Sequence, residues 1–181
     1  MKLYRARIPT IAKAVISDLT KEGALDVTPE QAPEAELDLV AIMEEYQRRD
    51  GQLRNAVKDY MSRRAVSYDQ YGKVRSAIAQ EWNHPSGDDV ERFLARQFVE
   101  NFMISNFIEE VYWDDSALYK RIVDLIRGFD VDERAIRDEA REKVKNLKEG
   151  SVDYEIALEG AIREVKKRHG LLIERPRNNK R

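Results

Sequence analysis

The stretch SYDQYGKVRSAI at residues 67–78 returns in diverged form as SVDYEIALEGAI at residues 151–162. The serine and the Ala-Ile pair recur at one constant offset of 84 residues (151 − 67 and 161 − 77). In both copies, Ser and Asp, which are favoured at helix N-caps, precede apolar residues at helical spacing. The recurrence favours two diverged copies of one helical unit, and a chance match between periodic helices is the alternative.

Apolar periodicity predicts four helices in each copy. Asp50-Gly51 interrupts the first copy between its second and third helices, and His84-Pro85-Ser86-Gly87 marks the boundary between the copies. The expected helices cover residues 8–19, 34–49, 53–61 and 67–82, then 88–112, 114–127, 135–147 and 151–169. We therefore predict an all-α protein in which two similar four-helix units pack into one helical body. The units are residues 1–85 and 86–172, followed by a disordered basic tail at 173–181.

The expected core follows from the same periodicity. Residues 88–112 form the most apolar stretch, which is typical of a central, buried helix. In the helix expected at residues 34–49, the buried side chains should include Leu37, Val40 and Met43. Elsewhere, burial is predicted for Phe98, Phe102, Ile122, Ile136, Val144 and Ile162.

Composition narrows the class of protein. The 181 residues are 36% charged and 42% hydrophobic, and 8 Gly and 5 Pro leave few breaks between long helices. A net charge of −2 argues against a general nucleic-acid coat. The absence of cysteine excludes disulfides, thiolate zinc sites and a cysteine nucleophile, and it suits a reducing cytosol. No apolar window approaches the ~20 residues of a spanning helix, so we expect a cytoplasmic protein with no membrane partner.

Both ends of the chain carry a family resemblance. The opening Lys2-Leu3-Tyr4 with Arg7-Ile8-Pro9, and the closing Lys166-Lys167-Arg168-His169-Gly170-Leu171, resemble the bacterial domain-of-unknown-function 507 family. Gly150-Ser151 with Asp153-Tyr154 strengthens the resemblance, which covers most of the chain. It implies a small helical protein with no assigned activity, and it carries over no catalytic residue.

The residues that could carry chemistry form no recognised constellation. His84 and His169 both lie beside expected helix ends, outside any metal-ligand spacing, where a polar end residue is the ordinary role. Adjacent carboxylates such as Glu109-Glu110 diverge on a helix and cannot converge on a metal unaided. We predict no catalytic residue, no metal and no cofactor. An enzyme with an unrecognised carboxylate site is the third and last class considered.

An acidic stretch is the first candidate for contact with a partner. Ala24 to Tyr46 contains no Lys or Arg but includes Asp26 and Glu30 among seven acidic residues. Some of these acids are explained by the favourable field at a helix N-terminus. The other interpretation is a docking face for a basic partner.

The consecutive pair Tyr112 and Trp113 is the second candidate. We expect the pair at the end of a helix, just before Asp114-Asp115. Adjacent side chains point in different directions, so both are not expected to be fully buried in a monomer. Exposed aromatic residues beside acids are typical of interface hot spots. An interface with a partner or with a second copy is one interpretation, and a half-buried boundary position is the other.

The basic C-terminus is the third candidate. The basic residues at 166–168 lie late in an expected helix, where positive charge interacts favourably with the helix dipole. The basic residues after the helix either make the tail soluble or contact nucleic acid. The residues concerned are Lys166, Lys167, Arg168, Arg175 and Arg177. We predict a non-enzymatic protein that acts through contacts with an unidentified protein or with itself. The alternative is a nucleic-acid-associated protein that uses the basic C-terminal segment.

Overall fold

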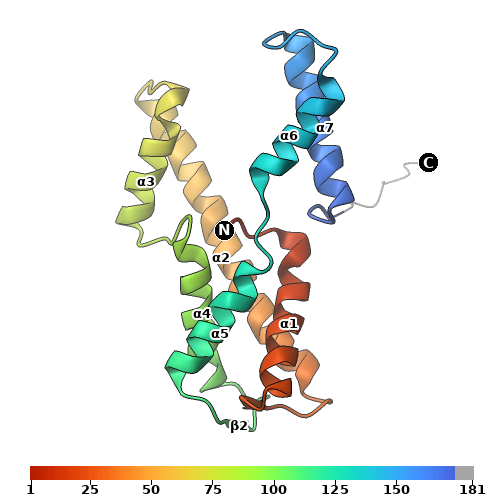
Figure 1. The fold of residues 1–181 in the computed structure, drawn as a ribbon. Coiled ribbons are helices and arrows are strands. Elements are labelled where there is room, and N and C mark those ends of the chain that lie inside the picture. The colour runs from red at the N-terminus through yellow and green to blue at the C-terminus, as the bar shows by residue number, and fades with distance from the viewer. Residues whose placement is uncertain (174–181) are drawn as a thin grey trace, which may run out of the picture. The chain divides into compact units, whose positions relative to one another are not determined.

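The structure is a computed structural model that describes residues 1–173, and within them it confirms the all-α fold. The C-terminal segment expected to be disordered lies outside the described residues from position 174 onward. No helix in residues 1–173 is both long and apolar enough to cross a membrane. The helices are α1 (Ile8–Lys21), α2 (Ala32–Arg63), α3 (Tyr71–Glu81), α4 (Asp89–Phe102), α5 (Asp115–Arg127), α6 (Glu133–Val144) and α7 (Val152–Arg168). Two 3-10 turns, Arg5–Arg7 and Tyr68–Gln70, and two short strands, β1 (Leu25–Asp26) and β2 (Glu110–Val111), complete the fold (Figure 1).

The chain divides into two compact units, and the division differs from the predicted one. Unit 1 contains Met1–Leu3 and Ile8–Phe129, and unit 2 contains Tyr4–Arg7 and Asp130–Arg181. The boundary expected at His84–Gly87 is not where the structure divides, because α4 packs on α2 and α5 packs on both α1 and α4. The predicted duplication therefore stays a prediction, since neither unit corresponds to one half of the chain.

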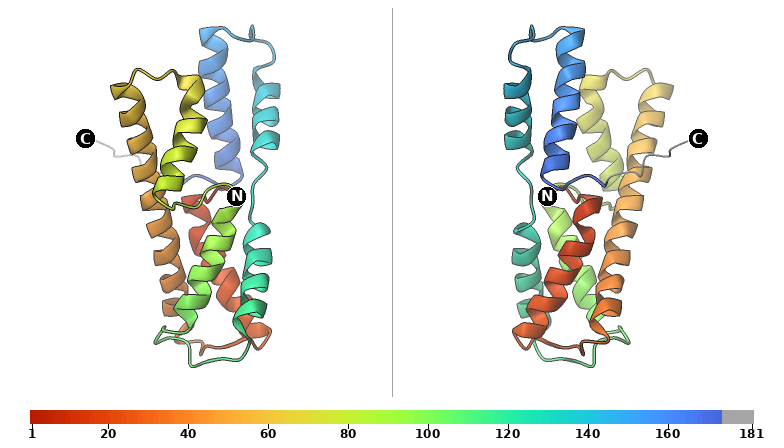
Figure 2. Two further views of the ribbon diagram at one scale, coloured as in Figure 1. Left: turned by 90° about the vertical axis from the view of Figure 1, so that its left-hand side faces the viewer. Right: turned by 90° about the vertical axis from the view of Figure 1, so that its right-hand side faces the viewer.

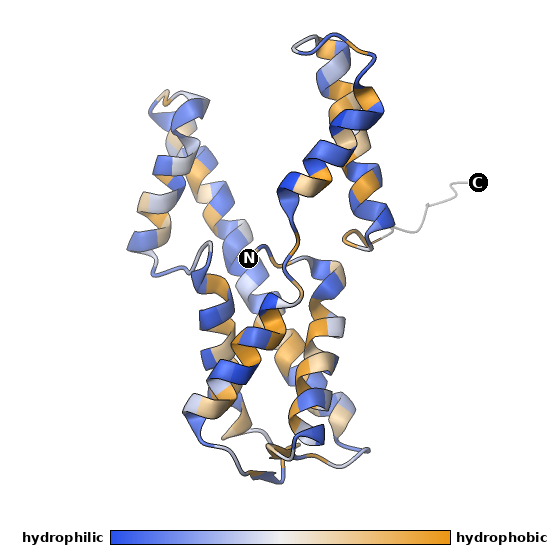
Figure 3. Cartoon of the chain, viewed as in Figure 1, coloured by the Kyte–Doolittle hydropathy of each residue, from blue (hydrophilic) through white to orange (hydrophobic). Residues whose placement is uncertain are grey.

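Unit 1 is built around two helix–strand–helix segments, α1–β1–α2 and α4–β2–α5. Their strands pair antiparallel, with Leu25 opposite Val111 and Asp26 opposite Glu110, and Figure 2 shows the loops of both segments at the same end of the bundle. The four helices are amphipathic (Figure 3) and enclose one core. Its fully buried side chains include Ile8, Ile11, Leu19, Leu39, Met43, Leu94, Phe98, Leu118, Ile122 and Ile126.

α2 is a single helix where two were predicted. It runs through Gly51 because the buried stripe that contains Met43 and Tyr46 continues without a phase change to Leu53 and Val57. This second half of α2 packs against α3 in a small core of Leu53, Val57, Met61 and Ala79. The register of the first half also differs from the prediction. Leu39 faces the core, whereas Leu37 is 56% exposed.

α4 is shorter than the apolar stretch predicted. It ends at Phe102, and the next residues form a loop before β2. Ser105 stabilises this loop, because its hydroxyl donates to Asp38 Oδ2 at 2.7 Å and accepts from the Phe107 amide at 3.3 Å. Such short polar side chains offer the backbone an alternative to helix. The expected burial of Phe98 and Phe102 is nevertheless confirmed, as is that of Ile122, Ile136 and Val144, while Ile162 is half-buried.

Unit 2 consists of a hairpin formed by α6 and α7, together with the early segment Tyr4–Arg7, which packs with it. Asp132 caps α6, accepting from the amides of Arg134 and Ala135, and Ser151 caps α7, accepting from the Tyr154 amide at 3.1 Å. The core between the helices includes Tyr4, Ile136, Ala140, Val144, Tyr154, Ala161, Val165 and Leu171. The Tyr4 hydroxyl donates to Glu133, which ties the early segment to α6.

Candidate functional site

Two loops far apart in the sequence meet at one end of unit 1. The Tyr112 amide donates to the Ala24 carbonyl at 2.9 Å, and the Glu109 amide donates to the Asp26 carbonyl at 2.8 Å. These bonds flank the β1–β2 pair and fix the loop after α1 beside the loop after α4. The acidic stretch and the aromatic pair, which the sequence presents as separate features, therefore lie on one surface.

This end of unit 1 carries charge of a single sign. We define the acidic end as residues 22–38 and 100–115. The first segment has six Asp or Glu and the second has five, and neither contains Lys, Arg or His. None of these carboxylates forms an ion pair with any residue in the described range 1–173. Elsewhere in unit 1, by contrast, Asp18 pairs with Arg121 and Asp50 with Arg75, both at 2.7 Å.

Large apolar side chains are exposed among these acids. Ile104 is 79% exposed, Tyr112 is 61% exposed, and Leu37 and Met103 are also exposed. The hydrogen bond from Ser105 to Asp38 holds the loop after α4, which carries Ile104, against the first turns of α2, which carry Leu37. Scattered exposed apolar residues are ordinary, but several gathered at one end are typical of an interaction surface.

The structure separates the roles of Tyr112 and Trp113. Both follow β2 and do not end a helix, so the predicted setting of this pair is wrong. Trp113 is half-buried against the core of unit 1, while the Tyr112 hydroxyl projects to Asp26 Oδ2 at 3.4 Å. The Asp26 carboxylate, together with partial desolvation, raises the pKa of Tyr112. Tyr112 is therefore the exposed aromatic side chain of the pair, and Trp113 packs against the core of unit 1.

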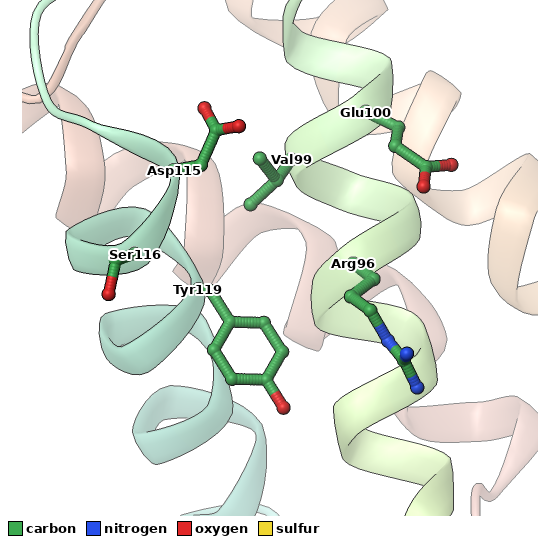
Figure 4. Close-up of a pocket in the computed structure, with 6 residues that line it drawn as sticks. All are labelled: Arg96, Val99, Glu100, Asp115, Ser116 and Tyr119. Atoms are coloured by element: carbon green, nitrogen blue, oxygen red, sulfur yellow. The ribbon is translucent and has the colours of Figure 1, made fainter.

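A hollow of about 390 Å³ between α4 and α5 adjoins the acidic end (Figure 4). Val99 and Tyr119 lie between the two helices, Asp115 borders the hollow from α5, and the side chains of Arg96 and Glu100 extend from α4 away from α5. Glu100 and Asp115 belong to the acidic end, and Arg96 is the basic residue of the lining. Met103, which is exposed, follows the last residue of α4. The hollow is suited to an apolar anchor of a bound partner.

The predicted basic site residues are placed elsewhere. Lys166, Lys167 and Arg168 lie in unit 2, and Arg175 and Arg177 lie outside the described residues. Lys166 Nζ is 3.0 Å from Glu133 Oε2 and lies over the Tyr4 ring, 5.4 Å from its centroid. Arg168 forms an ion pair with Glu139. Intramolecular contacts therefore occupy Lys166 and Arg168.

His84 differs from its predicted role as a polar residue at a helix end. Its ring is buried and stacks on Tyr46, with the centroids 5.0 Å apart. His84 Nε2 lies 3.5 Å from Asp50 Oδ1 without forming a hydrogen bond. Burial lowers the pKa of His84, and the Asp50 carboxylate only partly opposes this. Burial also raises the pKa of Tyr46 to about 12. Both rings are therefore neutral packing elements near pH 7, a setting that local sequence does not reveal.

The described residues hold no group of three or more His, Asp or Glu side chains arranged to bind a metal. The class defined so far is a small all-α protein with an acidic, partly apolar surface at one end of its helical core. The chain matches the family described as "Protein of unknown function (DUF507)" over residues 1–171 and belongs to that family. No curated protein matches it.

Proposed function

We propose that this protein works by binding, and that the acidic end of unit 1 docks a basic, amphipathic segment of another protein. The observation that carries the proposal is that the two segments of the acidic end hold eleven acidic residues and no basic one, together with exposed Leu37, Met103, Ile104 and Tyr112. Like charges held together repel, so this arrangement lowers stability and favours a cationic partner. The absence of cysteine suits work in the cytoplasm.

The exposed apolar residues supply the affinity in this proposal, and the carboxylates supply the choice of partner. Contact energy concentrates in buried aromatic and aliphatic anchors, while rim charges mainly govern encounter rate and specificity. Tyr112 and Ile104 are the proposed anchors. Asp26, Glu30, Glu109 and Glu110 are the proposed charged rim.

Co-purification of the tagged protein from cell lysate tests this proposal. We compare wild type with Glu30→Gln/Glu109→Gln/Glu110→Gln, which removes three exposed charges from the acidic end. The matched control is Asp59→Asn/Glu81→Gln/Glu155→Gln, which removes three exposed charges elsewhere. The first variant should lose its partner at low salt and the control should keep it, while raising the salt from about 0.05 to 0.5 M should weaken the wild type because screening shortens to a few ångströms. Equal partner recovery from both variants would contradict the proposal.

Nucleic-acid binding through the basic C-terminal segment is the alternative, and the same experiment separates it. It predicts that nuclease treatment removes the co-purifying material and that deletion of residues 174–181 has the largest effect. Our proposal predicts that Tyr112→Ala has a larger effect than this deletion, and that nuclease has none.

A further inference from the structure

The outer face of α7 carries an ordered sequence of apolar, acidic, basic and apolar groups. Val152, Ile156, Glu159 and Arg163 follow one another at intervals of four, three and four residues, which places them on one stripe of the helix. Tyr154, Ala161 and Val165 lie on the opposite side, buried against α6. Val152 is 76% and Ile156 66% exposed. The hairpin of unit 2 therefore buries one side of α7 and leaves a second partly apolar side open.

Further exposed apolar residues follow the C-terminal end of α7. Gly170, with a φ of +65°, turns the chain so that Leu171 enters the core while Leu172 and Ile173 remain exposed. Leu172 and Ile156 line the same hollow of about 620 Å³ along α7, together with Glu159 and Arg163. Gly160 also lines it, and no atom lies within 4 Å of where its Cβ would be. A second helix can approach the backbone closely at this position.

We propose that this face of α7 binds the same face of a second copy of the protein, with the two helices antiparallel about a two-fold axis. A two-fold interface uses one patch on both subunits, so the patch must be complementary to itself. In the antiparallel arrangement, Glu159 meets Arg163 of the partner subunit, and Val152 lies beside the partner's Leu172. A parallel arrangement instead places Glu159 against the partner's Glu159. The order of charged and apolar groups along this face therefore favours a second copy of the protein as the partner, and it favours the antiparallel orientation of the two helices.

The size of the face sets the expected strength of the dimer. α7 has 17 residues, so its length is about 26 Å. One helix pair of this length buries less than the roughly 1,600 Å² of a standard stable interface. We therefore expect a weak dimer whose population rises with protein concentration. All the contacts proposed for the dimer come from residues of unit 2.

A charge-swap experiment on the full chain tests the proposal. Analytical ultracentrifugation from about 5 to 500 μM should show a reversible dimer for wild type. Glu159→Arg or Arg163→Glu alone should weaken dimerisation about tenfold or more, because each sets like charges against each other twice across the axis. The double variant Glu159→Arg/Arg163→Glu should restore dimerisation to within about threefold of wild type.

Two further variants test whether the dimer forms through α7 and not through another surface. Ile156→Arg should abolish the dimer, because it replaces an apolar contact with a cation beside the partner's Lys166, and Arg137→Glu, a charge reversal on exposed α6, should leave it unchanged. Circular dichroism verifies that each variant is folded. Sedimentation of wild type as a monomer throughout would overturn the proposal. So would a dimer that tolerates both single reversals, or one that the double variant fails to restore. The variant Glu30→Gln/Glu109→Gln/Glu110→Gln should dimerise like wild type, so this result stands apart from the partner-binding test.

Discussion

At the scale of single residues, His84 shows how burial changes what a side chain contributes. Its ring packs on Tyr46 and its Nε2 has no hydrogen-bond partner among the described residues. Since burial lowers the pKa of His84 below its ordinary value, the unfolded chain takes up this proton at a higher pH than the folded chain does. Protonation therefore favours unfolding, and stability falls as the pH drops through the ordinary histidine pKa near 6.5.

His84→Phe should remove this pH dependence while keeping a ring on Tyr46. Urea denaturation at several pH values between about 5 and 8 measures the free energy of unfolding of both proteins. We expect the difference between variant and wild type to shift in favour of the variant as the pH falls below about 6.5. Any constant packing cost of the Phe ring cancels in this comparison. Parallel curves for the two proteins would show that His84 is protonated equally in both states.

At the scale of elements, the boundaries that depend on local chemistry were predictable and those that depend on tertiary contacts were not. α1 was predicted correctly because six apolar residues share one face and Gly23, with a φ of +70°, ends the helix. The residues after Phe102 look helical by hydropathy, but β2 pairs with β1 and Ser105 bonds to Asp38. These partners lie more than sixty residues away in sequence, so the local sequence pattern cannot predict that the helix ends at Phe102.

Gly51 is the corresponding case inside α2, and it provides a direct test of helix continuity. Its φ is not positive, and a Cβ added there would meet no atom within 4 Å. Gly51→Ala should therefore raise the free energy of unfolding by about 0.5–1 kcal/mol, because alanine loses less backbone entropy in a helix interior. Chemical denaturation followed by circular dichroism measures this change.

Gly23→Ala is the matched control for Gly51→Ala. The positive φ of Gly23 disfavours any L side chain, so this variant should be destabilised by about 1 kcal/mol or more. Destabilisation by Gly51→Ala as well would mean that the helix breaks at Asp50-Gly51, as the sequence alone indicates.

At the scale of the whole molecule, the sequence predicted the components of the candidate site but not that they lie on one surface. The acid-rich stretch after α1 is plain from composition, and Tyr112 was singled out for its position beside acids. The meeting of the two was not predictable, because two-residue strands carry too little pattern to identify their pairing. The compact units of the structure differ from the two halves of the sequence for a related reason. His84–Gly87 reads as a linker, yet α4 after it packs on α2 before it.

The most direct test of the central claim is photo-crosslinking in cells with benzoylphenylalanine at position 104, in the acidic end. Position 68, an exposed tyrosine in the 3-10 turn before α3, is the control. We predict a protein adduct at position 104 whose captured segment, identified by mass spectrometry, is rich in Lys and Arg. This adduct should decrease when Glu30, Glu109 and Glu110 are changed to Gln, and position 68 should not yield it. An adduct that is absent at position 104, equally strong at position 68, or unaffected by loss of the three charges would contradict the account.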